Sequence, residues 1–305
     1  MVVLCGGVGA ARFLDGLVRV VPPESVTAIV NVGDDAVFHG LHVSPDVDTI
    51  LYTLSGLVDQ ERGWGIRGDT ARVQDALARL GDETWFHLGD ADLATHLFRT
   101  ERLRGGAPLS VVTEELRAVL GLRLRVLPAT DEISPTTVRT DAGWLAFQQY
   151  FVRRGARDRV HEVKLGGGAP APGVLEAIAS ANVVVVAPSN PIVSIGPILA
   201  VRGVREALAS TSATIVAVSP IVGGRAIKGP AADMLASLGH DVSPVGVARI
   251  YRDLLDVLVL DEADAGDASA VAALGVRPVV TDTIMRDAHA RERLAHRTIE
   301  GALHA

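Results

Sequence analysis

The 305-residue chain has one cysteine, few aromatic residues and no apolar run long enough to cross a bilayer. The single cysteine, Cys5, excludes an intramolecular disulfide, and we expect it to fill space in the first strand. The most apolar later segment, residues 183–187, is far shorter than the ~20 residues of a transmembrane helix. Residues 1–5 include no basic region and predict a strand, not a secretory signal. These absences predict a cytoplasmic protein with no membrane partner.

Basic residues are nowhere concentrated into a run. The 29 Lys and Arg residues are intermingled with 36 Asp and Glu residues, which leaves a net charge of -7. The sequence therefore lacks a stripe of positive charge that could follow a polyanion. We expect no nucleic-acid partner.

The composition indicates the kind of core. Aromatic residues make up 4% and hydrophobic residues 48% of the chain, so the core must consist mainly of Val, Leu, Ala and Ile. That filling is typical of parallel strands covered by helices. Strand-like segments that alternate with helical patterns are residues 2–5, 26–32, 183–187, 214–219 and 257–260. The sequence therefore predicts an α/β fold, Rossmann-like and doubly wound, with a mainly parallel sheet.

The middle of the chain has a different pattern. Between residues 68 and 121 the apolar positions recur at helical spacing, separated by glycine-bearing turns. Residues 122–127, 136–140 and 144–152 have the texture of short strands, which we expect to extend the sheet at one edge. We predict one domain over residues 1–305, with a core of about 1–67 and 160–305 and an inserted, mostly helical subdomain of about 68–159.

A glycine-rich segment, residues 6–9, separates the first strand from a helical pattern. Because Gly6, Gly7 and Gly9 lack side chains, backbone N–H groups at the helix start could hold a phosphate, and Arg12 could add a positive charge. The dinucleotide fingerprint is incomplete, since Arg12 stands where its third glycine would fall. A phosphate loop and a tight turn both remain open, and a nicotinamide-dependent oxidoreductase ranks well behind.

Four acids lie close together after the second strand. They are Asp34, Asp35, Asp46 and Asp48. Unpaired acids this close would repel, and Mg²⁺ bridging a substrate diphosphate would neutralise them, which makes Asp34, Asp35 and Asp46 candidate metal ligands. Alternatively, Asp34 caps a turn, and Asp46 or Asp48 caps the helix that starts near Thr49.

Two loops after later strands are rich in polar and rigid residues. Pro188–Pro191 contains Ser189 and Asn190 and leads past Ser194 into a helix, and a similar loop at residues 219–225 contains Gly223. Their hydroxyl, amide and backbone groups suit a nucleotide at the same sheet edge as the glycine-rich segment. Ordinary strand-to-helix turns are the alternative.

One tryptophan stands between two glycines. Trp64 could stack on a planar ring, and packing in a local core is an equally open interpretation. The histidines at positions 39, 42, 87 and 96 have no spacing that indicates a zinc site.

Five segments, taken in order, resemble the motif series of the 2-phospho-L-lactate transferase (CofD/FbiA) family. They are residues 6–14, 44–49, 88–96, 188–197 and 219–224. The resemblance covers nearly the whole chain and implies a Rossmann-like fold and a homodimer. The chain departs from the family at residues 146–150, where Ala146 replaces a common histidine and Gln149 stands at a position often acidic.

The resemblance implies a Mg²⁺-dependent transferase. Such an enzyme moves a phospholactyl or phosphoenolpyruvyl group from a guanosine diphosphate adduct to Fo, the deazaflavin alcohol that is a precursor of coenzyme factor-420, and releases GMP. Asp48 falls where the family has an acid that contacts Fo, and is the catalytic candidate; His87 and Trp64 are further candidates for binding Fo. The alternative from another class is a non-catalytic nucleotide-sugar-binding regulator of the same superfamily.

Overall fold

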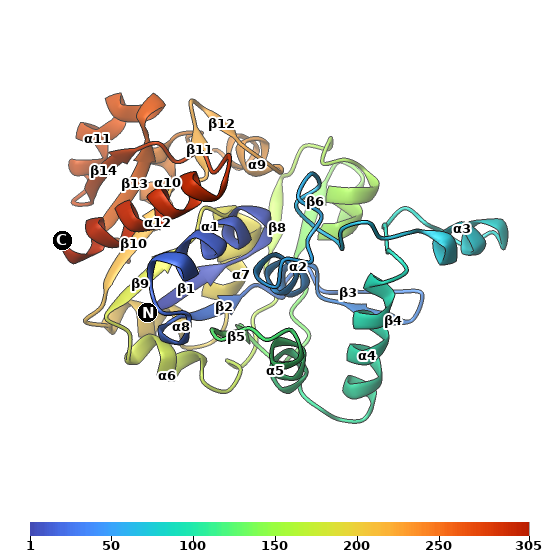
Figure 1. Ribbon diagram of the computed structural model, residues 1–305. Coiled ribbons are helices and arrows are strands. Elements are labelled where there is room, and N and C mark those ends of the chain that lie inside the picture. Colours follow the sequence, from blue (N-terminus) through green and yellow to red (C-terminus); the bar gives the residue numbers. More distant parts are fainter. Residues whose placement is uncertain (305) are drawn as a thin grey trace.

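The computed structural model describes residues 1–304, which form a central sheet covered by helices on both faces (Figure 1). Over these residues the main sheet has seven strands in the order β14-β13-β10-β9-β1-β2-β5, and every pair is parallel. The strands are β1 (Val2–Cys5), β2 (Thr27–Val30), β5 (Arg125–Pro128), β9 (Val183–Val186), β10 (Thr214–Val218), β13 (Val257–Asp261) and β14 (Arg277–Thr281). The predicted α/β fold class is confirmed.

Two groups of helices cover the two faces of this sheet. One face packs against α1 (Gly7–Val20), α2 (Pro45–Leu54), α5 (Leu109–Val119) and α12 (Ala288–Leu303). The other packs against α6 (Val174–Ala179), α7 (Gly196–Leu199), α8 (Val204–Ser210), α9 (Ala231–Ser237), α10 (Pro244–Ile250) and α11 (Ala268–Ala272). Because the sheet is buried on both faces, the sequences of its inner strands are continuously apolar.

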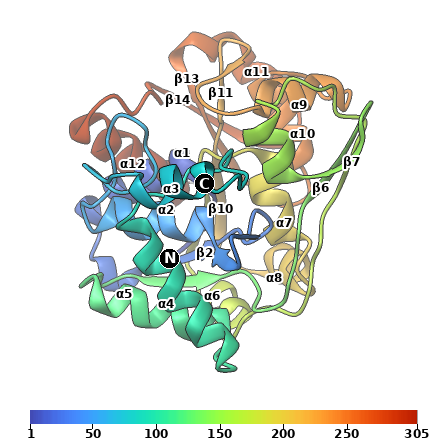
Figure 2. The same ribbon diagram turned by 90° about the vertical axis from the view of Figure 1, so that its right-hand side faces the viewer.

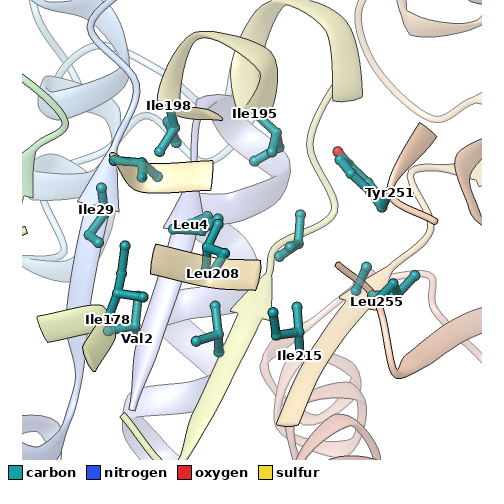
Figure 3. Packing of buried hydrophobic residues seen from close by; sticks show 14 of the residues in the cluster. Val2, Leu4, Ile29, Ile178, Ile195, Ile198, Leu208, Ile215, Tyr251 and Leu255 are labelled. Atoms are coloured by element: carbon teal, nitrogen blue, oxygen red, sulfur yellow. The ribbon is translucent and has the colours of Figure 1, made fainter. Parts of the chain in front are cut away.

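Figure 3 shows the packing on the second face, where Leu4, Ile29 and Ile215 meet Ile178 and Ile198 from the covering helices. Each of these side chains is almost fully buried, and burying one contributes roughly 2 kcal/mol. On the opposite face Cys5 is buried as a free thiol, as expected for a space-filling residue. Among residues 1–304 we find no helix with the length and apolarity that crossing a bilayer requires.

The order of the strands reverses direction beside β1. The chain passes from β1 through α1 to β2 on one side of β1, and later returns to β9 on the other side. At such a switch point the connections that leave the two neighbouring strands diverge, and the space between them is where open α/β sheets bind ligands.

The central part of the chain forms two further helices and two small sheets. The helices α3 (Arg72–Arg79) and α4 (Asp92–Arg104) and the hairpin of β3 (Ala36–Phe38) and β4 (Leu41–Val43) lie to one side of the main sheet, beyond α2 (Figure 1). Figure 2 shows β6 (Thr137–Thr140) and β7 (Gly143–Ala146) running side by side at the edge of the molecule. β6 also pairs with β8 (Glu162–Lys164).

These elements correct two details of the sequence analysis. β5 extends the main sheet at its edge as expected, whereas β6 and β7, expected there too, belong to a separate small sheet with β8. Residues 149–153, predicted as part of a strand, form a helical turn, η2 (Gln149–Arg153). The remaining short elements are η1 (Pro23–Ser25), η3 (Pro191–Ile195), η4 (Glu262–Asp267) and the hairpin of β11 (Ile221–Val222) and β12 (Arg225–Ala226).

Candidate active site

The candidate site lies at the carboxyl ends of β1, β2, β9 and β10, and begins with the glycine-rich segment. The helix α1 starts at Gly7, so residues 7–9 are its first turn and not the expected loop. Gly9 is needed for packing, because a Cβ on it would lie 2.2 Å from the Pro188 carbonyl oxygen. A Cβ on Gly6 would lie 2.6 Å from Oδ2 of Asp46. A carboxylate therefore stands at the start of α1.

Asn31 joins two of the predicted metal ligands. It is fully buried, and its Nδ2 donates to Oδ1 of Asp34 at 3.1 Å and to Oδ2 of Asp46 at 2.8 Å. Its Oδ1 accepts a hydrogen bond from the backbone N–H of Gly33, which fixes the orientation of the amide. The Asp46 carboxylate also accepts from the backbone N–H of Gly7. The arrangement holds two carboxylates beside the N-terminus of α1.

The environment of this pair favours neutralisation of its charge. Burial raises the pKa of Asp46 to about 6. Burial also raises the pKa of Asp34 well above its ordinary value, and the negative charge of Asp46 raises it further. Two buried carboxylates this close disfavour each other's ionised form, so a proton or a metal cation bound here stabilises the pair.

Asp35 does not share the hydrogen bonds of this pair. Its Oδ2 accepts from Nε2 of His42 at 3.0 Å and from the Ser44 hydroxyl at 2.6 Å, while its buried Oδ1 has no hydrogen-bond partner among the described residues. Burial raises the pKa of this carboxyl group. Asp35 therefore has its own hydrogen-bond partners, and its charge also raises the pKa of Asp34 and of Asp46.

Two of the three acids predicted as metal ligands are placed so that they could bind Mg²⁺ together. In the described part of the chain, no three His, Cys, Asp or Glu side chains gather in a way that could hold a metal. Asp34 and Asp46 nevertheless form an all-oxygen pair, and Mg²⁺ is often bound through one or two carboxylates, with substrate phosphates and water completing its shell. These two residues fit the ion, and Asp35 does not join them.

Asp48 is engaged in a buried ion pair. It lies in the first turn of α2, and its Oδ2 accepts from Nη1 of Arg99 at 3.1 Å while its Oδ1 accepts from Nη2 of the same guanidinium. Arg99 is fully buried on α4, and Nδ1 of His96 lies 3.7 Å from Asp48 Oδ2. A bidentate pair of this kind is strong and directional. Asp48 therefore fixes α2 to α4, a role that sequence analysis missed because Arg99 is 51 residues away.

Trp64 and His87 come together at the surface. Their ring centroids are 5.9 Å apart in an edge-to-face arrangement, and Trp64 is 41% exposed. The guanidinium carbon of Arg62 lies 5.7 Å from the Trp64 ring centroid, and Arg62 Nη1 is 3.4 Å from His87 Nε2. The structure thus joins two of the three residues predicted to bind Fo and adds Arg62, which sequence analysis did not single out. The third, Asp48, pairs with Arg99 instead.

The predicted nucleotide-binding side chains also shape their own loops. The Ser189 hydroxyl donates to the Gly6 carbonyl at 2.9 Å, and Asn190 Oδ1 accepts from the backbone N–H of Ile192 at 2.9 Å, which caps η3. Ser194 lies beside Gly6, with its Cβ 3.0 Å from the place of a Cβ on that glycine. These contacts bring the loop after β9 against the end of β1. Their part in nucleotide binding stays a prediction.

The backbone N–H of Gly223, also predicted to bind nucleotide, has a partner within the protein. Its backbone N–H donates to the carboxylate of Asp264, at 3.0 Å from each oxygen. Gly223 has a φ of 55° and lies in the turn between β11 and β12, where glycine adopts this left-handed conformation without strain. Its N–H points to a protein acid in this structure, and phosphate binding there stays a prediction.

The fold is that of a Rossmann-like α/β protein, and the buried acids lie at the switch point of its sheet. The chain belongs to the family described as 2-phospho-L-lactate transferase CofD, whose model matches residues 1–302. It is therefore a member of a transferase family.

Individual relatives agree with this assignment. A phosphoenolpyruvate transferase from Streptomyces griseus is 44% identical over 309 residues, covering 98% of this chain and 97% of that protein. A 2-phospho-L-lactate transferase from Methanothermobacter thermautotrophicus is 41% identical over 285 residues, covering 93% of this chain and 92% of that protein. A crystal structure of a UPF0052 family member from Bacillus halodurans shares the fold, with a TM-score of 0.68 and 19% identity, covering 98% of this chain and 97% of that one.

Proposed function

We propose that the protein transfers a phospholactyl or phosphoenolpyruvyl group from a guanosine diphosphate adduct to the primary alcohol of Fo. The observation that carries the proposal is the pair of buried acids, Asp34 and Asp46, held by Asn31 beside the N-terminus of α1. Family membership and the names of the relatives support the same chemistry. A helix N-terminus attracts phosphate, and a carboxylate pair can hold the cation that accompanies a diphosphate.

In the proposed reaction the Fo oxygen attacks the phosphorus nearer the three-carbon unit. A new P–O bond forms to Fo, the P–O bond to the GMP phosphate breaks, and the alcohol proton leaves to solvent or to a neighbouring base. Mg²⁺ bound by Asp34 and Asp46 would neutralise charge on the diphosphate. The backbone N–H groups at the start of α1 would orient the phosphoryl oxygens, because the helix end is positive.

The acceptor would lie over the Trp64 and His87 surface. Trp64 is partly exposed and has the His87 ring beside it, and an aromatic pair of this kind suits a planar ligand such as a deazaflavin. For Asp48 we propose positioning rather than proton transfer, since both of its oxygens already accept from Arg99. Through that pair Asp48 would hold the first turn of α2, which carries Asp46.

The test is a transfer assay with the purified protein, Fo and Mg²⁺, using the phospholactyl and phosphoenolpyruvyl guanosine diphosphate adducts separately. GMP release and the mass of the deazaflavin product are followed for wild type, Asp46→Ala and the exposed control Asp253→Ala. We expect product with at least one adduct, lost in Asp46→Ala and kept in the control. Folded protein that binds nucleotide but forms no product with either adduct would favour the non-catalytic regulator.

The oligomeric state belongs to the same proposal. We expect a homodimer in solution, and light scattering coupled to size-exclusion chromatography measures it. A monomer at the concentrations of the assay would contradict the proposed homodimer and would not contradict the proposed transfer reaction.

A further inference from the structure

A group of positive charges without acidic partners lies on the outer side of α1. Arg12 is half-buried on α1, and Lys228 follows β12 in an exposed loop. Among the described residues neither has a carboxylate within salt-bridge distance. By contrast the neighbouring Arg291 pairs with Asp15, its Nη1 lying 2.8 Å from Oδ2 of the acid. Arg12 and Lys228 are thus cations without counter-charges.

Contacts bring these two residues into one place. Burial lowers the pKa of Lys228, and the positive charge of Arg12 lowers it further. A Cβ on Gly63 would lie 2.7 Å from Val8 Cγ1 and 3.1 Å from Lys228 Nζ. Val8 and Arg12 are four residues apart on α1 and therefore lie on one face of the helix.

The same contacts connect the cations to the proposed acceptor surface. The Lys228 ammonium donates to the Arg62 carbonyl, and the Arg62 side chain lies over Trp64 and beside His87. The Arg62 side chain has one acid nearby, Asp59 at 3.8 Å. Lys228 therefore adjoins the surface expected to hold Fo, and Arg12 lies on the same face of α1 as Val8, which contacts the same segment near the helix start, where the phosphates of the donor are expected.

We infer that Arg12 and Lys228 form a binding site for the carboxylate of the three-carbon unit carried by the donor. The ligand identity rests on the proposed function, because the phosphates are assigned to the start of α1 and the carboxylate is the remaining anionic group of the donor. Arg12 lies five residues beyond Gly7, about 7 Å along the helix axis, a span that its own side chain can bridge back toward a group attached to the phosphorus.

The location matches what the reaction requires of this carboxylate. The three-carbon unit is bonded to the phosphorus that Fo attacks, so its carboxylate must lie near both the donor phosphates and Fo. The unit leaves with the product, so the site contacts the donor before transfer and the product after it. It selects acids over neutral analogues, and it does not distinguish phospholactate from phosphoenolpyruvate, because both carry the carboxylate.

Equilibrium binding without Fo tests the inference separately from turnover. The ligands are the phospholactyl guanosine diphosphate adduct, the same adduct with a carboxamide in place of the carboxylate, and GDP. Wild type should bind the acid about 10- to 100-fold more tightly than the carboxamide, because hydrogen bonds to charged groups are lost in the neutral ligand. Arg12→Gln and Lys228→Gln should each remove most of this preference and leave the affinity for GDP within about twofold.

The chain supplies a matched control. Lysine occurs at only two positions, 164 and 228, so Lys164→Gln on β8 removes the same charge away from α1 and should leave the preference intact. Arg12→Lys should keep part of the preference, as expected for a charge that acts directly on the ligand.

The outcomes separate the inference from the proposed function. Equal weakening of GDP and of the acid adduct in Arg12→Gln and Lys228→Gln would overturn the inference and identify a phosphate site. Equal binding of acid and carboxamide by wild type would also overturn it. Preference for the acid in wild type with no transfer to Fo would contradict the proposed function and leave the carboxylate site standing.

Discussion

The carboxylate of Asp48 and the guanidinium of Arg99 form a bidentate ion pair in the interior, with Arg99 completely shielded from solvent. Removing one partner leaves the other as an unpaired buried charge. We expect Asp48→Ala to lower the free energy of unfolding by about 3 to 5 kcal/mol. Urea denaturation measures this, and Asp48→Ala with Arg99→Met in one chain should recover part of the loss. Full stability of Asp48→Ala together with lost transfer would instead indicate direct catalysis by Asp48.

The pKa of Asp46 predicts a dependence of stability on pH. The carboxyl group has a pKa of about 6 in the folded protein and an ordinary value of 3.8. Because the folded state binds this proton more tightly, the stabilisation is present at low pH and is lost as the pH rises through about 6. Without divalent cations, wild type should lose about 1 to 3 kcal/mol relative to Asp46→Asn between about pH 4 and pH 7. Urea titrations at several pH values measure the difference, and parallel profiles would contradict it.

Removal of Mg²⁺ gives a separate prediction for the two acids that share Asn31. An ion that binds only the folded state raises the melting temperature. We expect Mg²⁺ to raise the melting temperature of wild type, and chelation to reverse the rise. Asp34→Asn and Asp46→Asn should lose this response. Asp35→Asn should keep it, because the Asp35 carboxylate contacts His42 and Ser44 instead. If only Asp35→Asn lost the response, the metal site would have to be assigned to Asp35 and not to Asp34 and Asp46.

Trp64 should contribute to Fo affinity through its exposed ring. Because stacking on a planar ligand contributes about 1 kcal/mol beyond buried area, Trp64→Ala should weaken Fo binding about 5- to 10-fold, and Trp64→Phe should weaken it less. Titration followed by the absorbance of Fo measures both. Trp144→Ala on β7 is the matched control, since Trp144 is 48% exposed and belongs to a different sheet. Equal effects at both tryptophans would argue against a specific Fo surface.

A methyl group at Gly9 should disturb the contact between α1 and the loop after β9. The added Cβ would lie 2.2 Å from the Pro188 carbonyl oxygen, so one backbone segment must move. We expect Gly9→Ala to cost about 1 to 3 kcal/mol and to lower nucleotide affinity. At Gly266 a Cβ would meet no atom within 4 Å, so Gly266→Ala should be close to neutral. Thermal unfolding of both variants compares them, and equal melting temperatures would show that the contact can relax.

The sequence predicted the inner strands well because they are buried on both faces. β1, β2, β9, β10 and β13 appear as continuous apolar runs for this reason. β14 was missed, since this edge strand is only partly buried and contains Pro278, which is tolerated there. β5 was expected at the edge of the main sheet and lies there, whereas β6 and β7 were recognised as strands and expected in the wrong sheet, because periodicity indicates the type of an element and not its partner.

The site was predictable as a region and not as a set of contacts. Clusters of acids and glycines at strand ends located Asp34, Asp46 and Gly7 correctly at one edge of the sheet. The pairing of Asp48 with Arg99 depends on how α4 packs, which no local pattern encodes. Lys228 was missed because it lies just beyond the glycine-rich turn, although the scarcity of lysine in the chain was a signal that could have drawn attention to it.

The close contact of α1 with α12 has a consequence for the order in which the site is completed. A Cβ on Gly16 of α1 would lie 2.4 Å from the backbone of Arg291 on α12, so the two helices touch through their main chains. During synthesis the residues of α1 leave the ribosome before those of α12. The helix that begins at the candidate site therefore stays without this cover until residues 288–303 have been translated.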